Sequence, residues 1–534
     1  MSADQSKLNP ELVKWLNARQ SALKIVKTTV TPSGQTLDWI PIENQVPAGK
    51  IATPPPPGSI PTRIIDARRP VLPAALELDA PNVERGPAGT VPLVRPDLSR
   101  LTRTIAIKDY LVKRGGLRVN TQRSKEGPLE PSTTNYFHVK DSQNTTLYGA
   151  DFFLNVWDPV IDEPVSDGED HSILQVWLQN YDKRQLQSLE GGWTVDRSLN
   201  NDAIAHVFTY YTTNGYSQDG DNLGGYNRLH NGWVQYSPSV FPGIRINGIS
   251  TWGGQQLEIS MKFQLYQEPN SSTFNWWVAV QGIWMGYYPA TLFNGGLGNK
   301  AEWVGIGGEV ATDLSNPATT KDQMGSGWQA PAGWTHAAYI RNIRNQSDLN
   351  GTMVNNNGTG GTDAPAGVAN PYTIQTFMNS GSSWASYLYG GGQTPLADET
   401  AKFNQITFDI GTGGDDLRGD SSATVSVSLP GGAQIFTLKA QSDPEWGNNS
   451  DDVKTFAIAG AAQPLSAFGP MTVTLTSHNS IFETDDNWNI QYVVVTVSGS
   501  SGSAVIFSQA GNPLSRLTGS RPSVTLQPGT SGQA

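Results

Sequence analysis

A single carboxylate stands out in the segment "WVGIGGEVAT", residues 303–312, where Glu309 is the one charged residue. The segment is too short for a buried helix and too apolar for a loop, so it predicts a strand. A glutamate held in a cleft among apolar neighbours can act as a general acid or base in hydrolysis. Most glutamates are simply solvated, and taken alone Glu309 is better explained by the wet face of a sheet.

The other reactive residues show no spacing typical of a metal site or a catalytic triad. No HExxH or other close ligand spacing occurs among the histidines, and no GxSxG turn is present. The histidines are His138, His171, His206, His230, His336 and His478. Cysteine is absent, which excludes disulfides and cysteine nucleophiles. Carboxylates and aromatic side chains remain as candidates, with no cofactor expected for catalysis.

The composition indicates an aromatic-rich β protein. The chain has 534 residues, of which 16% are charged, with 56 glycines, 16 tryptophans and 17 tyrosines. This length predicts two or three domains, and the profile suits a secreted all-β protein better than a helical cytosolic enzyme. A net charge of −11 argues against a nucleic-acid partner, because phosphate binding requires a basic surface.

We expect the protein to be extracellular, although no signal peptide is visible. The first residues, "MSADQSKLNPEL", lack the apolar core of a signal peptide. Either export uses another route, or the chain begins after its signal. No apolar run approaches the roughly 18 residues of a membrane span, so no membrane partner is predicted.

Residues 1–131 are predicted to form a region with little core of its own. Asn9 and Pro10 mark the start of a helix, and residues 27–42 alternate around the turn "PSG" as a short hairpin does. The tract "ATPPPPGSIPTR" and the irregular sequence after it indicate a polyproline-like strap.

The rest of the chain predicts two β-sandwiches, so the expected fold class is all-β. Residues 132–393 should form an antiparallel sandwich, in which "QLEISMKFQLYQ", residues 256–267, alternates as a half-buried strand does. Residues 394–534 should form a second, smaller sandwich, because "ATVSVSLPGG", "MTVTLTS" and "QYVVVTVSGS" alternate cleanly between turn residues.

Five ordered blocks between about residues 135 and 392 resemble the neprosin domain of glutamic peptidases that cleave after proline. The blocks are "SILQVWLQNYDKRQLQSLEGGWTVD", "GGYNRLHNGWVQ", "NWWVAVQGIWMGYYPATLF", "WVGIGGEV" and "QMGSG". The resemblance implies that Glu190, in "SLEGGW", and Glu309, in "GGEV", are the catalytic pair. Many plant members carry a cysteine pair where this chain has Gly225 and His230, so packing must hold that loop.

The resemblance also implies a zymogen. The N-terminal hairpin and "GPAGTVPLVRP", residues 86–96, are similar to the activation peptide of that family. A proline-rich strap across a peptidase that cleaves after proline would lie there as a pseudo-substrate. Acid would protonate carboxylates, loosen the strap and allow the protein to cleave itself.

Residue chemistry agrees with a pair of glutamates in unlike protonation states. One carboxylate takes a proton from water while the other, protonated, donates to the leaving nitrogen. Two neighbouring carboxyl groups cannot easily both ionise, and apolar neighbours such as Trp303 and Trp193 raise the pKa further. The sequence does not indicate which glutamate is the acid and which is the base.

Several other residues are candidates for the same site. Gln175 in "ILQVW" is a candidate for oxyanion stabilisation or water positioning, although a polar residue on the outer face of the sheet explains it at least as well. Aromatic side chains could line a groove that accepts proline rings, and most of them could equally belong to the core. These are Trp177, Trp193, Tyr226, Trp233 and Tyr287.

The segments "GTGGDDLRGDS" and "FETDDNWNI" resemble a PLAT-like β-sandwich, a module whose relatives contact lipids or proteins and sometimes bind calcium. The oxygen-rich residues on the two loops are Asp415, Asp416, Asp485 and Asp486. They could converge on one calcium ion, or they could form ordinary turns at strand ends. The partner of this module is not predicted.

The sequence therefore predicts a secreted, self-activating glutamic endopeptidase that hydrolyses peptide bonds after proline at acid pH. Its substrate would be a proline-rich peptide or protein. Two alternatives stay open at this point. Two glutamates among aromatic residues also describe a glycoside hydrolase, and a non-catalytic protein that binds carbohydrate or protein would carry such glutamates incidentally.

Overall fold

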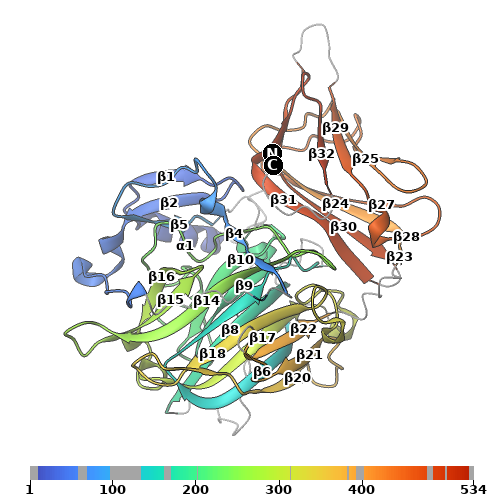
Figure 1. Cartoon of the computed structure of the whole chain (residues 1–534). Helices are drawn as coiled ribbons and strands as arrows, with labels where there is room; N and C mark the ends of the chain where they lie inside the picture. Colours follow the sequence, from blue (N-terminus) through green and yellow to red (C-terminus); the bar gives the residue numbers. More distant parts are fainter. Residues whose placement is uncertain are drawn as a thin grey trace.

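The computed structural model describes residues 10–57, 66, 69–96, 113, 134–161, 170–183, 185–200, 202–312, 314, 316–381, 384–392, 402–477, 485–499 and 502–527. Most of these residues lie in antiparallel β-sheets, so the predicted all-β fold class is confirmed (Figure 1). Within these ranges, no helix is long and apolar enough to cross a membrane. The predicted domain boundaries, at residues 131–132 and 393–394, fall outside the described ranges and stay predictions.

The N-terminal segment forms the predicted helix and hairpin. Its elements are α1 (Pro10–Ser21), β1 (Lys27–Val30), β2 (Thr36–Pro41), β3 (Val71–Pro73), β4 (Ala75–Leu76) and β5 (Thr90–Val94). Strands β1, β2 and β5 form a three-stranded sheet. Trp39, Leu76 and Leu78 are fully buried within the core of the following sandwich. The N-terminal segment, predicted to have little core of its own, therefore shares the hydrophobic core of its neighbour.

The first large sheet contains seven strands and carries both predicted catalytic glutamates. Its strands are β6 (Asn135–Leu147), β8 (His171–Asp182), β9 (Gln185–Asp196), β10 (His206–Thr212), β11 (Gly224–Tyr226), β17 (Ala301–Thr312) and β20 (Thr359–Asp363). Their spatial order is β11-β10-β9-β8-β17-β6-β20. Strand β17 thus lies between β8 and β6, although it follows them by more than a hundred residues.

The second large sheet contains ten strands and packs against the first. Its main order is β12-β16-β15-β14-β7-β18-β22-β21, with β19 beside β18 and β3 beside β14. Its other strands are β7 (Gly149–Asn155), β12 (Val234–Gln235), β14 (Gln256–Gln267), β15 (Phe274–Val280), β16 (Ile283–Pro289), β18 (Ala338–Gln346), β19 (Met353–Asn355), β21 (Thr373–Phe377) and β22 (Tyr387–Gly391). The short elements α2 (Arg197–Asn200) and β13 (Ile246–Asn247) lie in connections.

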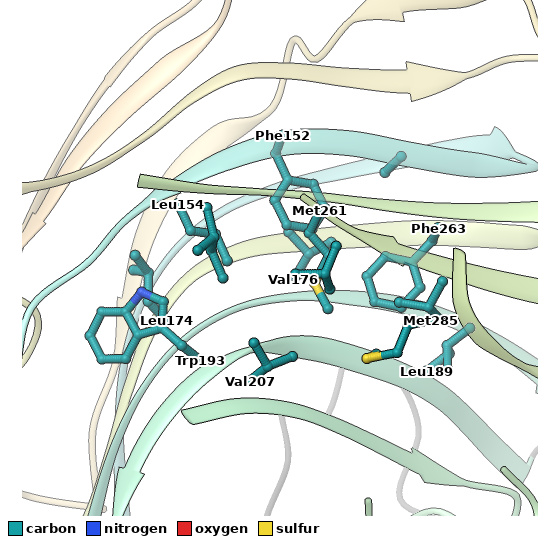
Figure 2. Close-up of a cluster of buried hydrophobic side chains, with 14 of the residues drawn as sticks. Phe152, Leu154, Leu174, Val176, Leu189, Trp193, Val207, Met261, Phe263 and Met285 are labelled. Carbon is teal, nitrogen blue, oxygen red and sulfur yellow. The ribbon is translucent and has the colours of Figure 1, made fainter. Parts of the chain in front are cut away.

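Apolar side chains from both sheets form the core between them. Figure 2 shows Phe152, Met261 and Phe263 of the second sheet near Val176 and Leu189 of the first. These residues alternate along their strands with side chains on the opposite face. Burying such aromatic and aliphatic side chains contributes roughly 1.5–3 kcal/mol each. The core thereby fixes which face of β8, β9 and β17 points away from it.

Strand β14 confirms the predicted strand, but the prediction of a half-buried one is wrong. Glu258 and Lys262, expected to face solvent, are almost completely buried. Arg341 on β18 forms an ion pair with Glu258, and its Nε donates to Glu258 Oε2 at 2.9 Å. A charged partner across the sheet covers the outer face here, and periodicity along one strand gives no sign of it.

The C-terminal part is a separate sandwich with its own hydrophobic core. Two four-stranded sheets, ordered β27-β24-β30-β31 and β26-β25-β29-β32, enclose residues such as Phe408, Val425 and Trp488. The strands are β23 (Lys402–Phe403), β24 (Gln405–Thr412), β25 (Ser422–Val427), β26 (Gln434–Lys439), β27 (Asp451–Ala457), β28 (Gln463–Pro464), β29 (Met471–Thr476), β30 (Trp488–Gly499), β31 (Gly502–Leu517) and β32 (Ser523–Leu526).

One buried carboxyl group in the first sheet predicts how stability depends on pH. Asp141 on β6 is fully buried, and neither of its carboxyl oxygens has a hydrogen-bond partner among the described residues. Burial raises the pKa of Asp141 to about 7. The folded protein therefore holds this proton more tightly than the unfolded chain does, and stability falls as the pH rises from about 4 to 7.

We expect Asp141→Asn to unfold at higher urea concentration than the wild type at pH 8, because the variant carries no charge to bury. The gain is at most about 4 kcal/mol, and it should shrink at pH 5, where the wild-type carboxyl is already protonated. Asp416→Asn, at a less buried position, is the control and should show no such gain. Equal gains at both pH values would contradict this account.

Candidate active site

The two predicted glutamates lie on one face of the seven-stranded sheet, on strands that flank β8. In the pairing of β9 with β8, Glu190 is directly opposite Trp177. In the pairing of β17 with β8, Gly307, two residues before Glu309, is directly opposite Gln175. Two strand spacings, about 10 Å, therefore separate β9 from β17. Both glutamate side chains are fully buried, and they reach toward each other across β8.

A lysine from the N-terminal part of the chain joins the two glutamates. Lys113 Nζ lies 2.6 Å from Glu190 Oε2 and 3.1 Å from Glu309 Oε2. The lysine side chain is completely buried, as are both glutamates. The same Nζ is 3.4 Å from Gln175 Oε1 and lies 5.6 Å from the centre of the Tyr210 ring. The carboxyl groups thus meet at one point, which the ammonium group occupies.

Two imidazoles and an amide surround Glu309. Its Oε1 lies 3.0 Å from His171 Nε2, and its Oε2 lies 2.9 Å from His138 Nε2. Gln175 Nε2 donates to the same Oε2 at 3.2 Å. His138 is directly opposite Glu309 in the pairing of β6 with β17. Each donor strand is thus a neighbour of β17, so the sheet itself aims these groups.

Hydroxyl groups surround Glu190 in place of imidazoles. Ser188, two residues earlier on the same face of β9, donates to Glu190 Oε1 at 2.9 Å. The Tyr216 hydroxyl donates to the same oxygen at 2.5 Å. Burial raises the pKa of Tyr216 well above its ordinary value, and the nearby Glu190 raises it further, so the phenol stays a donor.

The two environments give the carboxyl groups different electrostatics. Burial by itself would raise the pKa of Glu309, but Lys113 and the two imidazoles lower it well below its ordinary value. Burial likewise opposes the charge of Lys113, yet the two carboxylates raise the pKa of its ammonium group. We expected apolar neighbours to raise the pKa of a glutamate here, and for Glu309 the structure gives the opposite direction.

Glycines on both sides of Gln175 leave the centre of this face without side chains. Gly192 on β9 and Gly307 on β17 are each paired with Gln175 on β8. A Cβ atom at Gly192 would lie 1.9 Å from the Leu174 carbonyl oxygen, and one at Gly307 would lie 1.9 Å from that of Val139. Neither position accepts a side chain, and the bare backbone lets a ligand approach closely.

The predicted aromatic groove residues divide between two locations. Trp177 lies near His138, and Tyr226 packs against Tyr210, so both stay candidates for the glutamate face. For the other three the structure corrects the prediction. Trp193 and Trp233 belong to the core between the sheets, and Tyr287 packs under residues 46–52 of the N-terminal segment. Alternation along β9 turns Trp193 to the face opposite Glu190.

Gly225 and His230, the positions where many plant proteins of the resembled family carry cysteines, do lie together. A Cβ atom at Gly225 would come within 2.6 Å of the His230 ring. The His230 ring also packs on Trp15 of α1, with ring centres 5.4 Å apart. Packing of the His230 ring thus holds this loop, for which no disulfide is available.

The four aspartates of the predicted calcium site do not form a ligand group. Asp415 pairs with Arg516 at 2.7 Å, and Asp486 pairs with Arg418 at 3.2 Å. In the described part of the chain, no three acidic or histidine side chains converge as metal ligands. Two arginines already neutralise carboxylates that calcium would need, so these residues do not fit the ion, and the calcium site stays a prediction without support.

A lysine supplies positive charge near Asp486. Lys439 is fully buried, and its Nζ donates to the carbonyl oxygens of Ser421 at 2.7 Å and Gly419 at 3.0 Å. Burial lowers the pKa of Lys439, while Asp443, Asp420 and Asp486 act in the opposite direction. The ammonium group thus occupies a position among oxygen atoms that a cation would otherwise favour.

The sequence interpretation missed most groups around the pair. Ser188 could have been found, because residues two apart on a strand share a face. His138 and His171 required the strand order, since β6 and β8 become neighbours of β17 through long-range pairing. Nothing in the sequence near Lys113 indicates its contact with both glutamates.

Comparison with known protein families gives one match to this part of the chain. A family model described as Neprosin matches residues 168–393, which include Glu190 and Glu309. The match covers less than half of the chain and indicates a function of the peptidase type. His138 and Lys113 lie before the matched segment.

Solved structures show weak likeness over short stretches. The alpha-toxin of Clostridium perfringens from avian strain SWCP is 16% identical, with 24% of this chain and 33% of the toxin covered and a TM-score of 0.20. Alpha toxin from Clostridium absonum is 17% identical, with the same coverage and TM-score. The chain thus covers about a third of the toxins that it matches, and the likeness supports no inference about function.

Removing Lys113 should destabilise the full chain at neutral pH. Lys113→Met leaves two buried carboxylates without their cation, at a cost of about 3–5 kcal/mol. Because the pKa of Glu309 is lowered in the folded state, this stabilisation is present above about pH 4.3 and is lost as the pH falls. Urea unfolding should therefore show a large difference in stability between Lys113→Met and the wild type at pH 7, and a smaller difference at pH 3.

Lys300→Met is the matched control, because Lys300 pairs with Glu302 at the surface. Exposed pairs contribute about 0–1 kcal/mol, so this variant should differ little from the wild type at either pH. A Lys113→Met chain as stable as the control at pH 7 would show that the buried ion pair is not formed.

Proposed function

We propose that the chain is a secreted glutamic endopeptidase that cleaves after proline at acid pH and is made as a zymogen. The observation that supports this most directly is the position of Lys113 Nζ, within 3.1 Å of a carboxyl oxygen of both Glu190 and Glu309. A group at that point contacts both carboxyl groups at once. A water molecule there would meet the geometric requirement for general acid–base hydrolysis.

In the proposed reaction Glu309 is the general base. Two imidazoles and the Gln175 amide stabilise its negative charge, so it can stay ionised in acid, where an isolated glutamate would be protonated. Glu309 takes a proton from water as the water oxygen attacks the peptide carbonyl carbon. Gln175, between the two glutamates, orients the base and lies close to the developing oxyanion.

Glu190 is the general acid in this proposal. Its partners, apart from Lys113, are the hydroxyl groups of Ser188 and Tyr216, which are neutral hydrogen-bond donors. Once Lys113 leaves, Glu190 Oε2 can hold a proton and donate it to the leaving nitrogen as the carbon–nitrogen bond breaks. The products are a peptide ending in a carboxyl group and a peptide with a free amine.

Lys113 inhibits the proposed zymogen directly at its active site. Its ammonium group occupies the place of the water and neutralises both carboxyl groups, so the site is blocked and hydrolysis cannot begin. Transient protonation of the carboxyl groups in acid weakens both ion pairs and lets Lys113 leave, after which the two imidazoles and the Gln175 amide favour the ionised form of Glu309 again. Because the pKa of Glu309 is well below its ordinary value, release requires strong acid and not only a small drop below neutral pH.

Replacing either glutamate by glutamine should abolish most hydrolysis. We expect Glu190→Gln and Glu309→Gln each to lower kcat by about 10²–10⁴-fold, because glutamine neither accepts nor donates the transferred proton. Full-length protein is incubated with a proline-rich protein at pH 2.5 and pH 7, and mass spectrometry identifies the product ends. The wild type should yield C-terminal proline at pH 2.5 and should also shorten itself.

Glu302→Gln is the control on the same strand, because Glu302 on β17 is exposed. It should behave as the wild type does. Product ends without proline would disprove the specificity, and hydrolysis that persists in both site variants would disprove the glutamate mechanism. Turnover of a polysaccharide panel in place of peptides would favour a glycoside hydrolase.

The imidazole beside the base should set the acid limit of activity. His138→Gln removes a group that stabilises the Glu309 anion, so the pKa of the base rises and the acid limb of kcat/KM moves to higher pH by about one unit. The control His336→Gln alters an imidazole that packs on Trp328. A shift of the alkaline limb alone would show that Glu309 is not the base.

A further inference from the structure

Lys113 contacts the glutamate face through its backbone as well as through its ammonium group. The backbone N–H of Lys113 faces the carboxyl group of Asp219, which lies in the connection between β10 and β11, and it acts against the rise that burial causes in the pKa of this carboxyl group. The same residue thus shows where a peptide backbone passes beside the glutamate pair. The anchoring carboxyl group is separate from the two that meet the side chain.

Asp219 is held in place and keeps one acceptor available. The Tyr210 hydroxyl donates to Asp219 Oδ1 at 2.8 Å, and Tyr210 is directly opposite Glu190 in the pairing of β9 with β10. Asp219 Oδ2 is buried and makes no hydrogen bond to the described residues. Burial raises the pKa of Asp219 to about 7, so in acid the group is a neutral carboxyl that both accepts and donates.

A peptidase that cleaves after proline has a particular need for such an anchor. Proline has no backbone N–H, so the residue at the cleavage site cannot fix the substrate through that donor. The register of the bound chain must therefore come from N–H groups on the residues beside the proline. An acceptor placed close to the glutamates, and away from the reacting atoms, meets this requirement.

The geometry points to Asp219 as the substrate-anchoring residue, which accepts the backbone N–H of a residue next to the proline. The side chain of Lys113 reaches from this anchor to the glutamates. Its length is similar to that of two residues of extended chain, roughly 7 Å. The anchored residue is therefore one or two positions from the bond that breaks. This inference rests on the proposed peptidase function and adds the group that sets substrate register.

The test combines enzyme variants with substrates that lack single N–H groups. Acid-activated full-chain protein is assayed on a short proline peptide and on copies N-methylated at each residue flanking the proline. Asp219→Ala should lower kcat/KM about tenfold, mainly through KM, and Asp219→Asn, which keeps an acceptor, should recover most of it. N-methylation at one flanking position should cost the wild type about tenfold and cost Asp219→Ala nothing.

If Asp219 anchors the substrate, the effects of Asp219→Ala and of N-methylation should not add. This result separates an anchoring role from a structural one. A residue that merely stabilised the fold would lower activity on every peptide by the same factor, with or without the methyl group. Equal losses in wild type and Asp219→Ala at every N-methylated position would overturn the inference even if hydrolysis after proline is found. Asp79→Ala, which alters a carboxylate in the N-terminal segment, is the control for a substitution outside the glutamate face.

A binding measurement keeps the inference testable if no hydrolysis occurs. The full chain carrying Lys113→Ala and Glu309→Gln removes the blocking ammonium and one buried charge together, so the buried charges stay nearly balanced. A fluorescent proline peptide should bind this chain, and adding Asp219→Ala should weaken binding about tenfold. Binding that depends on Asp219 without hydrolysis would keep the anchor and reject the peptidase, while binding that ignores Asp219 would reject the anchor.

Discussion

The arrangement depends on one ammonium group shared by two buried carboxylates. Two like charges cannot be buried together without a cation, because the desolvation of each charge and their repulsion both oppose folding. Lys113 resolves this conflict for Glu190 and Glu309, with Nζ 2.6 Å and 3.1 Å from them. In the proposed reaction the same contact occupies the position of the attacking water. The burial of the two carboxylates and the proposed blocking of the site therefore have one physical cause.

The sheet supplies the geometry that makes this contact possible. Glu190 and Glu309 lie on either side of β8, and the residue between them, Gln175, has a glycine opposite it on both neighbouring strands. Long glutamate side chains cross the gap, while the glycines keep its floor open. The partners of the two carboxyl groups differ, since imidazoles reach Glu309 from β6 and β8 and hydroxyl groups reach Glu190. The different surroundings of the two carboxyl groups thus follow from which strands are neighbours.

The N-terminal segment is more than a covering strap. Trp39, Leu76 and Leu78 are buried in the core of the sandwich that carries the two glutamates, and Lys113 enters the glutamate face. One part of the segment therefore contributes to the packing, and Lys113 has the blocking role in the proposed zymogen. Ion pairs between carboxylates and ammonium weaken in acid, whereas hydrophobic packing has no charge to titrate. Acid should accordingly weaken the ion pairs of Lys113 before it loosens the packing.

Local patterns in the sequence determined the helix, the N-terminal hairpin and strands such as β14, because strand alternation and turn residues act over a few neighbouring positions. The blocks that carry Glu190 and Glu309 were found through their resemblance to a known family. Even Ser188 follows from alternation, once Glu190 is chosen. Tertiary structure alone decided that His138 and His171 would reach Glu309, that Lys113 would join both glutamates, and that Glu258 would be buried by Arg341. These contacts join strands far apart in the sequence, and their order in a sheet is set by the packing of the whole core.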